Sequence, residues 1–385
     1  MSDHENETKN SSGFRLTRRS LLKLVGAASA YTVLPGSGTA ASTQDAPGKK
    51  KVAITYSGYP YDRVAALTSG DVEVEGCKLT YAPDRIGNLN THVFSGAGTR
   101  DVSEVGLHPF MLAWANEEFR DYTLLPVFPL RVFRHKSIFI RTDRGIDRPE
   151  DLRGKRIATP GYSSTSLTWI RGVLADEYGV TPEDVEWVAT SKAVDATAGE
   201  TSKQEKVVPE GLTIHQGPSG KDESDLLESG EVDAVFHATE PRAYVERNPI
   251  VARLFADYRQ VERDYFAKTG VFPIMHAVAV RDDVIDENPW FLEAVFKAYS
   301  RAKKMNDEFL KKLGWAMISA PWLAQELEET RELMGDNFWP YGIEPNRKAL
   351  ETLFRYSYEQ GLASRELTIE ELFHPSTLEF SELVT

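Results

Sequence analysis

Two proline-containing segments, far apart in the sequence, constrain this chain more than any other feature. The first runs from Leu125 to Arg141 and reads LPVFPLRVFRHKSIFIR, and the second reads FPIMHAVAVR over residues 272–281. Prolines at the start of each segment exclude a helix there, and an apolar run typical of a strand follows. We therefore predict that both segments are crossings of the chain between two lobes, with hinges near residues 141–146 and 270–276.

The first segment also concentrates positive charge in a chain whose formal net charge is -13. Arg131, Arg134 and His135 lie within five residues of one another. Arginine forks suit carboxylates because they donate two parallel hydrogen bonds. Two interpretations stay open: surface side chains paired with nearby acids, or an anion-binding cleft where the lobes meet. The cleft interpretation predicts that Arg134 and His135 matter more for binding than the nearby Arg141 and Arg144.

Length, charge and cysteine content exclude several classes of protein. A chain of 385 residues is too long for one compact core, which indicates two domains. The acidic balance argues against nucleic acid as a partner. A single cysteine, Cys77, excludes an internal disulfide and any metal site built from several cysteines.

The N-terminal segment has the pattern of an export signal rather than of a folded element. Thr17–Lys23 reads TRRSLLK and resembles the twin-arginine export motif, and the apolar run after it is too short for a stable membrane span. We predict a signal peptide over residues 1–41, cleaved near Ala40 or Ala41, and a linker over residues 42–50. The alternative is a chance arginine pair before an amphipathic helix. Under the first interpretation the twin-arginine translocase is a partner, and the mature protein is extracytoplasmic without a lipobox cysteine.

From residue 51 onward, apolar strand patterns alternate with helical patterns, which is typical of an α/β fold. The long periodic segments near the end of the chain predict a helical C-terminal part. We assign residues 51–141 and 275–385 to lobe 1 and residues 142–274 to lobe 2. Residues 190–211 are polar and are predicted to form a surface loop.

Lobe 2 contributes two further groups of candidate residues. Ser163, Ser164 and Thr165 lead into a predicted helix, where hydroxyls and free N–H groups can bind an anion; ordinary N-capping is the alternative. His237 and Arg242 follow the last predicted strand of this lobe, at the carboxyl end where ligands bind in α/β sheets. The alternative is a structural role, which is the more frequent one for a lone histidine in that position.

The resemblance to a known family rests on four stretches: PVFPLRVFRHKSIFIR, WIRGVLADEYGV, FPIMHAVAVRDDVIDENPW and MGDNFWPYGIEPNRKALETLFRYSYEQGL. Together they resemble the 4,5-dihydroxyphthalate decarboxylase family over about residues 51–378. The resemblance implies the two-lobe, type II periplasmic binding protein fold of the sulfonate and thiamine-precursor branch. That fold is α/β, with mixed sheets flanked by helices. The chain differs from the family pattern at Gly106, His108, Gly161 and Ser163, and these differences leave the substrate open.

The same resemblance implies an enzyme that removes a carboxylate from an aromatic ortho-dicarboxylate without a cofactor. Such a site must hold carboxylates, protonate a ring carbon and manage a phenol proton. A divalent metal on the catechol oxygens is compatible with this chemistry, but no ligand spacing in the sequence requires one. The candidates are Arg131, Arg134 and Arg242 for the carboxylates, and His135, His276 and Glu104 for the protons.

The alternative function is an exported solute-binding protein of an ABC-type uptake system, for an aromatic or carboxylate ligand. The export signal and the fold favour this alternative, whereas the four specific stretches favour the enzyme. Its partner would be an ABC permease. We favour the decarboxylase, because a signal peptide specifies where a protein is located and gives no information about the reaction it catalyses.

Overall fold

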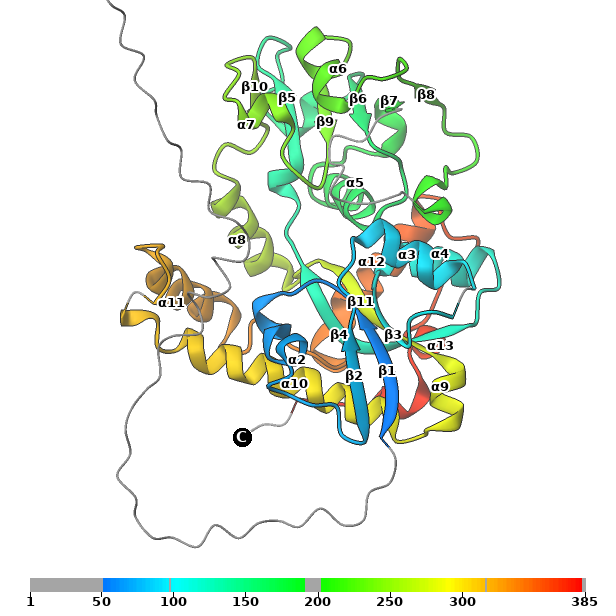
Figure 1. Cartoon of the computed structure of the whole chain (residues 1–385). Coiled ribbons are helices and arrows are strands. Elements are labelled where there is room, and N and C mark those ends of the chain that lie inside the picture. The colour runs from blue at the N-terminus through cyan, green and yellow to red at the C-terminus, as the bar shows by residue number, and fades with distance from the viewer. Residues whose placement is uncertain (1–50, 97, 191–201, 316, 383–385) are drawn as a thin grey trace, which may run out of the picture. The chain divides into compact units, whose positions relative to one another are not determined.

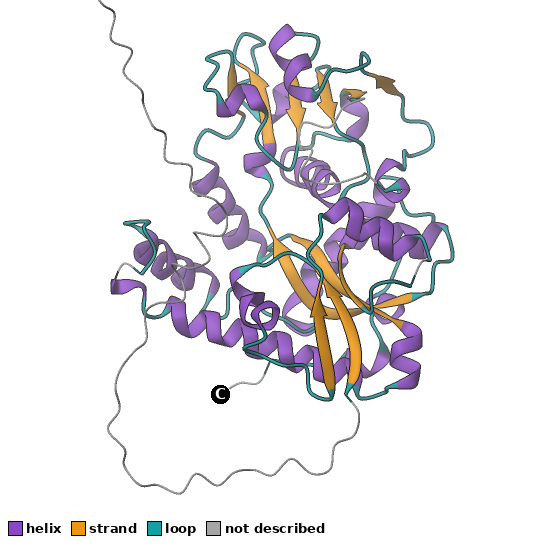
Figure 2. Ribbon diagram, viewed as in Figure 1, coloured by secondary structure: helices purple, strands orange, loops and turns teal. Residues whose placement is uncertain are grey.

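The computed structural model describes residues 51–96, 98–190, 202–315 and 317–382. Its strands form two sheets with helices packed around them, which confirms the predicted α/β class (Figures 1 and 2). The expected signal peptide and linker, residues 1–50, lie outside the described residues. Among the described helices, none is both long and apolar enough to cross a membrane.

The first sheet has five strands in the order β2-β1-β3-β11-β4. Strands β1, β2 and β3 are parallel, and β11 runs antiparallel to both of its neighbours. Strand β4 lies at an edge, which suits its Pro126 and Pro129 because a proline has no N–H for a second neighbour. The strand bounds are Val52–Ser57 for β1, Cys77–Tyr81 for β2, Val102–Gly106 for β3, Tyr122–Arg131 for β4 and Ile274–Arg281 for β11.

The second sheet has six strands in the order β10-β5-β9-β6-β7-β8. Strands β6 to β9 are parallel, whereas β5 runs antiparallel to both β9 and β10. The bounds are Ile138–Arg141 for β5, Arg156–Thr159 for β6, Glu186–Ala189 for β7, Ile214–Gln216 for β8, Ala234–Phe236 for β9 and Val251–Arg253 for β10.

The chain crosses between the sheets at two places. It passes from β4 to β5 through a 3₁₀ turn at His135–Ser137, and it returns from β10 to β11 through α8 (Tyr258–Thr269) and residues 270–273. The predicted lobe boundary at residue 141 is therefore wrong, because β5 pairs with β9 and β10 of the second sheet. The first crossing precedes the hinge region that was predicted at residues 141–146.

The first sheet separates two apolar cores. Alternate residues of β11 face opposite sides, so Ala277 and Ala279 join one core while Val278 and Val280 join the other. Helices α4, α5 and α12 contribute to the first core and α10 to the second. The helix bounds are Ala65–Ser69 for α2, Ile86–Phe94 for α3, Leu107–Asn116 for α4, Thr165–Tyr178 for α5, Glu223–Ser229 for α6, Arg242–Val245 for α7, Asp282–Glu287 for α9, Phe291–Leu310 for α10, Leu323–Met334 for α11, Arg347–Glu359 for α12 and Ile369–Leu372 for α13.

Helices α5 and α12 approach each other closely because α5 carries a glycine at the contact. A Cβ at Gly172 would overlap the ring of Tyr356, so no larger residue fits there without movement. The long helices predicted near the end of the chain are confirmed as α10, α11 and α12. The predicted surface loop over residues 190–211 is wrong in part. Residues 191–201 lie outside the described residues, but Ser202 and Gln204 are buried.

Candidate functional site

Glu104 and His276 form a buried pair on neighbouring strands of the first sheet. In the antiparallel register of β3 and β11, His276 lies opposite Gly106 and Glu104 lies opposite Val278, which places the two side chains diagonally on one face. His276 Nδ1 is 2.5 Å from Glu104 Oε1. The Glu104 side chain is 0% exposed and that of His276 is 12% exposed. The carboxylate is therefore shielded from water while the imidazole keeps some access to a ligand.

Two further groups donate hydrogen bonds to the same carboxylate. The main-chain N–H of Tyr59 donates to Glu104 Oε2 at 2.9 Å, and the hydroxyl of Tyr61 donates to Oε1 at 2.9 Å. Burial and the negative charge of Glu104 raise the pKa of Tyr61, so its phenol keeps the proton that it donates. The ring of Tyr59 stacks beside His276, with 6.4 Å between the ring centroids. The turn after β1 thus holds both members of the pair.

This turn approaches the carboxylate so closely that a glycine is needed within it. A Cβ at Gly58 would lie 2.7 Å from the Tyr56 hydroxyl and 3.0 Å from Glu104 Oε2. Burial, followed by the charge of Glu104, raises the pKa of Tyr56 and raises that of Tyr81 to about 12. Together with Tyr61, three protonated phenols surround one carboxylate.

His135 lies in a different environment, at the first crossing. It is 3% exposed, and neither ring nitrogen has a hydrogen-bond partner among the described residues. The rings of Phe255 and Tyr265 lie against it, at centroid distances of 5.4 and 5.2 Å. Burial lowers the pKa of His135 to about 4, so the ring is neutral at pH 7. In this placement the ring reaches neither a carboxylate nor an open surface, which argues against proton transfer by His135; that assignment remains a prediction.

Arg131, at the end of β4, is also enclosed by the protein. Its guanidinium donates to the side-chain oxygen of Asn346 and lies near the rings of Phe128 and Phe272. Its Nε is buried and has no hydrogen-bond partner among the described residues. Burial lowers the pKa of Arg131 to about 9, which still leaves it cationic at pH 7. The side chain is 5% exposed, so a carboxylate could reach it only after the surrounding groups move.

Arg134 is buried, and one of its three nitrogens has no hydrogen-bond partner among the described residues. Its Nε donates to Met275 Sδ and its Nη1 to the carbonyl of Ala238, each at 3.2 Å, whereas Nη2 makes no hydrogen bond to the described residues. Burial lowers its pKa to about 10, so it remains cationic. The hydroxyl of Ser166 also donates to Met275 Sδ, at 3.7 Å. Met275 directly precedes His276 in β11, where the pairing with β4 is irregular, so Arg134 contacts the strand next to the carboxylate pair.

The hydroxyls that precede α5 serve the protein's own structure. Ser163 donates to a main-chain carbonyl at 2.7 Å, Ser164 accepts an N–H at 3.4 Å as the N-cap, and Thr165 accepts the N–H of His108 at 3.1 Å. The capping interpretation is therefore correct for Ser164. An anion would use the N–H groups in the first turn of α5, which have no acceptor within the helix.

Arg242 lies among acids at the surface of lobe 2, with 41% of its side chain exposed. Hydrogen bonds to these acids raise its pKa. Three protein carboxylates already pair with its guanidinium, which argues against carboxylate binding by Arg242; that assignment remains a prediction. The three carboxylates are Asp222, Asp225 and Glu228, at 2.8–3.4 Å. His237 is 6% exposed and its Nδ1 accepts the N–H of Thr239, so its predicted contact with a ligand remains a prediction.

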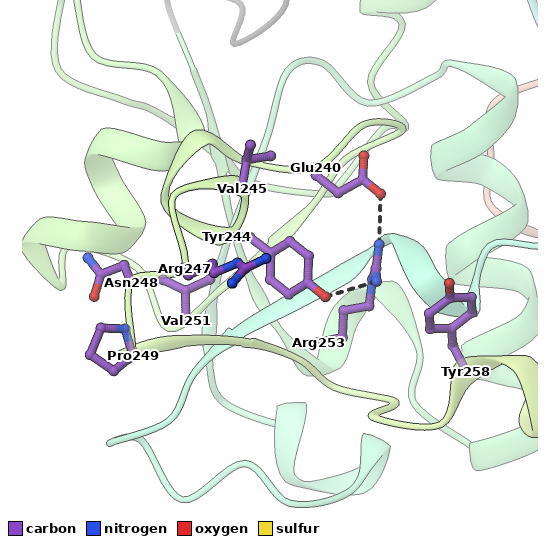
Figure 3. A pocket seen from close by; sticks show the side chains of 9 residues that line it. All are labelled: Glu240, Tyr244, Val245, Arg247, Asn248, Pro249, Val251, Arg253 and Tyr258. Carbon is purple, nitrogen blue, oxygen red and sulfur yellow. Dashed lines mark hydrogen bonds and ion pairs between the residues drawn. The ribbon is translucent and has the colours of Figure 1, made fainter. Parts of the chain in front are cut away.

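Arg253 shows a similar arrangement at a cavity of about 640 Å³ beside β10, the edge strand of the second sheet (Figure 3). Its guanidinium donates to the Tyr244 hydroxyl at 2.9 Å and to Glu240 at 2.7 Å. It also lies 4.6 Å from the ring centroids of both Tyr244 and Tyr258. The guanidinium of Arg253 is therefore already paired within the protein.

Comparison with known proteins decides the family. The chain is 33% identical to a protein named 4,5-dihydroxyphthalate decarboxylase from Comamonas testosteroni, over 322 residues that cover 83% of this chain and 95% of the relative. The chain belongs to the 4,5-dihydroxyphthalate decarboxylase family. A protein of the same name from Pseudomonas putida is 32% identical over 209 residues, which cover 54% of this chain and 78% of that protein.

Two further comparisons concern the fold of this decarboxylase family member. The profile described as NMT1/THI5 like matches residues 131–306. A periplasmic sulfonate-binding protein of an ABC transporter from Methylobacillus flagellatus superimposes with a TM-score of 0.52 at 14% identity, covering 86% of this chain and 94% of that one. At this identity the likeness shows the fold alone. The predicted type II periplasmic binding protein architecture is thereby confirmed.

In this member of the decarboxylase family, sequence reasoning found both residues of the buried pair but missed the groups that hold them. Tyr59 and Tyr61 lie directly after β1. Two tyrosines directly after the carboxyl end of a strand were the available signal, since that end is the ligand edge of an α/β sheet. His108 was also missed as a structural residue: its Nδ1 lies 2.7 Å from the carbonyl of Ser163 and its Nε2 lies 2.8 Å from the hydroxyl of Ser357.

Within the described ranges, no three or more His, Cys, Asp or Glu side chains are gathered closely enough to hold a metal ion. The expectation that the family chemistry needs no cofactor in this chain remains a prediction. Activity before and after dialysis against a chelator tests it directly.

Proposed function

We propose that this protein is a decarboxylase of an aromatic ortho-dicarboxylate, with 4,5-dihydroxyphthalate as the first substrate to test. Membership of the family supports the reaction class, and the relatives carry this activity in their names. The observation that carries the proposal is the short hydrogen bond between His276 and the fully buried Glu104. Such a pair can hold and deliver a proton, which is the central need of this reaction.

The chemistry is a replacement of a carboxylate by a proton. The ring carbon that bears the carboxylate takes up a proton, and the bond between the two carbons then breaks. The electron pair of that bond returns to the ring as CO2 leaves, so one proton is consumed and the second carboxylate stays on the product. A hydroxyl para to the departing carboxylate helps, because it can become keto-like as the ring carbon is protonated. The rate then depends on a well-placed proton donor.

In this proposal, His276 delivers the proton from Nε2, because its Nδ1 faces Glu104. The buried carboxylate fixes the orientation of the ring and stabilises the imidazolium by a charge-assisted hydrogen bond. Tyr61 and the N–H of Tyr59 hold the carboxylate in turn, so little reorganisation accompanies proton transfer. The ring of Tyr59 offers a flat surface beside the imidazole for an aromatic substrate.

The carboxylates of the substrate need cationic or N–H donors, and two groups near β11 supply them. Arg134 has Nη2 unused among the described residues, and it is held in place by Met275 and Ala238. The first turn of α5 provides main-chain N–H groups, and Ser166 in that turn also contacts Met275. Arg134 and α5 therefore converge on the strand residue that precedes His276. We assign the retained carboxylate to Arg134.

The test is incubation of the purified chain with 4,5-dihydroxyphthalate that carries ¹³C in both carboxylates. We expect labelled CO2 and a monocarboxylate product, and we expect His276→Asn to abolish both. His215→Asn is the matched control, because His215 is 49% exposed on β8 and lies in the other sheet. If the parent protein binds the substrate but releases no labelled CO2, the decarboxylase proposal fails.

A binding role without chemistry is the second candidate, and the arginine pair Arg18-Arg19 is the observation that favours it. An exported member of this fold could deliver an aromatic carboxylate to an ABC permease. Fractionation of cells that express the parent and a variant with both arginines changed to lysine tests export through the twin-arginine translocase. Calorimetry that finds tight binding, together with an absence of labelled CO2, would favour this second function.

A further inference from the structure

A second cavity lies between α8 and α11, and its walls are largely aromatic. Its volume is about 400 Å³, which is within the range of small-molecule sites. The apolar lining comes from both crossings, from α8, from α11 and from the segment after α11. The lining side chains are Phe133, Phe266, Phe272, Leu333, Met334, Phe338 and Trp339, with Tyr258 at one side.

The rings in this cavity are held in defined orientations by one another. Phe133 of the first crossing stacks on Phe272 of the second, with centroids 4.6 Å apart and planes at 24°. Phe266 meets Phe133 edge-on at 6.4 Å, and Trp339 meets Phe272 edge-on at 5.4 Å. Trp339 Nε1 donates to the carbonyl of Phe128 at 2.9 Å, which fixes the indole. The cavity is therefore a preformed aromatic surface rather than a loose gap.

Five polar side chains also line the cavity, and Glu262 offers an oxygen to a ligand. The five are Arg259, Glu262, Arg263, Glu326 and Thr330. Glu262 Oε1 accepts the main-chain N–H of Lys136 at 3.2 Å, while Oε2 makes no hydrogen bond to the described residues. Burial raises the pKa of Glu262 to about 7. Arg259 and Arg263 line the same cavity but form ion pairs with acids of α11, chiefly Glu329, so their charges are already balanced.

We propose that this cavity is a second small-molecule site, which binds a flat, uncharged aromatic compound bearing a hydroxyl group. The rings supply stacking and edge contacts, and the free oxygen of Glu262 accepts the hydroxyl proton. A carboxylate ligand is disfavoured, because Glu262 would lie beside it and both arginines are paired. This site lies outside the Glu104–His276 pair and does not depend on the proposed decarboxylation.

Occupancy of this cavity also affects the connection between the two sheets. Phe133 precedes Arg134 in the first crossing, and Phe272 lies two residues before β11 in the second. A ligand packed against both rings holds the two crossings in one arrangement, and any motion that separates the rings must first release it. By linkage, the ligand stabilises whichever arrangement of the sheets keeps the rings stacked.

Calorimetry with 2-naphthol as the probe tests the site directly on the full chain. We expect one molecule bound per chain, and at least tenfold weaker binding in Leu333→Trp, whose added ring fills the cavity from α11. Met317→Trp is the matched control: it adds the same side chain at a residue that is 63% exposed, and it should bind the probe like the parent. Equal binding by parent and Leu333→Trp, or no binding by the parent at millimolar probe, overturns the assignment.

Hydrogen exchange gives a second readout that needs no variant. With 2-naphthol bound, the amides of residues 132–137, residues 270–273 and α8 should exchange more slowly, whereas those of β6 and β7 should not change. Protection confined to the exposed tryptophans Trp315 and Trp322 would place the probe on the surface and overturn the site. Binding in the cavity without protection of the two crossings would overturn the coupling.

Discussion

His276 and His135 show how differently the same side chain behaves in two buried regions of one molecule. His276 lies 2.5 Å from a carboxylate that two further donors hold in place. His135 is more deeply buried, but both of its ring nitrogens lack hydrogen-bond partners among the described residues, and aromatic rings surround it. Burial beside a carboxylate gives the His276 imidazole a charged hydrogen-bond partner, whereas burial among rings lowers the pKa of His135 and keeps its ring neutral at pH 7.

The arginines of the first crossing extend this comparison. Arg131 and Arg134 are both buried and neither contacts a carboxylate, so each carries a desolvated charge. Arg242, by contrast, is half exposed among three acids. A surface cation already paired with protein acids gains little from a ligand, while a desolvated cation with a free donor gains much. The comparison therefore ranks Arg134 above Arg242 as a ligand-binding residue.

The largest expected effect is on the carboxylate of the pair. Glu104→Gln keeps the size of the side chain but removes the charge that stabilises the imidazolium of His276. We expect kcat for decarboxylation to fall by about 10²–10⁴-fold, the usual contribution of a positioned acid–base group. The measurement is steady-state CO2 release, with circular dichroism to show that the variant is folded. A Glu104→Gln enzyme with parental kcat would remove the pair from the mechanism.

The second prediction concerns Arg134, and it holds for an enzyme and for a binding protein alike. Arg134→Met removes the charge but keeps an unbranched chain against Met275. We expect the affinity for 4,5-dihydroxyphthalate to weaken by about 2–5 kcal/mol, the typical cost of truncating a buried charged partner. Calorimetry measures it, with Arg242→Met as the control that should change affinity by less than about 1 kcal/mol. Equal losses in the two variants would mean that the ligand binds elsewhere.

The strands and both members of the buried pair could be predicted from the sequence because they rest on local patterns. The strand pattern of β3 and β11 can be recognised in the sequence, and a carboxylate and a histidine on such strands are candidates for proton transfer. The hydrogen-bond partners of the pair could not be predicted in the same way. Tyr59 and Tyr61 reach Glu104 only because β1 and β3 are neighbours in the sheet, and strand order is a property of the whole fold.

The first crossing shows the opposite case, in which a local pattern groups residues that the fold places in different surroundings. A cluster of cationic residues predicted an anion site, and a regular strand would have turned Arg134 and His135 to opposite sides. The segment instead forms a 3₁₀ turn at His135–Ser137, and the ring enters an aromatic cluster with Phe255 and Tyr265. Those two residues lie over a hundred positions away in the sequence, so no local pattern predicts their contact with His135.

The third prediction tests the inert histidine through the pH dependence of stability. The pKa of His135 is about 4 in the folded protein and about 6.5 when unfolded. Above pH 6.5 the ring is neutral in both states and contributes no pH dependence. As the pH falls from 6.5 to 4, the unfolded chain binds a proton that the folded protein does not, so the parent loses stability.

His135→Phe removes this loss. The free energy of unfolding of the variant minus that of the parent should be roughly 3 kcal/mol larger at pH 4 than at pH 7. Urea unfolding at the two pH values measures the difference, and CO2 release should remain near the parental rate. The comparison fails if His135→Phe abolishes activity while the protein stays folded, because the ring would then take part in the reaction.

The smallest effect is expected at Tyr61, which acts on the reaction through Glu104 rather than by contact with the reacting atoms. Tyr61→Phe keeps the ring and removes one of the two donors that hold the carboxylate, while the N–H of Tyr59 remains. We expect kcat to fall by about tenfold, or about 1.4 kcal/mol, with KM unchanged, because the substrate's own contacts are intact.

Tyr81→Phe is the matched control, since its hydroxyl donates to the carbonyl of Gly58 and not to Glu104. A rise in KM in place of a fall in kcat would show that Tyr61 binds the substrate, and equal effects in the two variants would show that the carboxylate does not need its second donor.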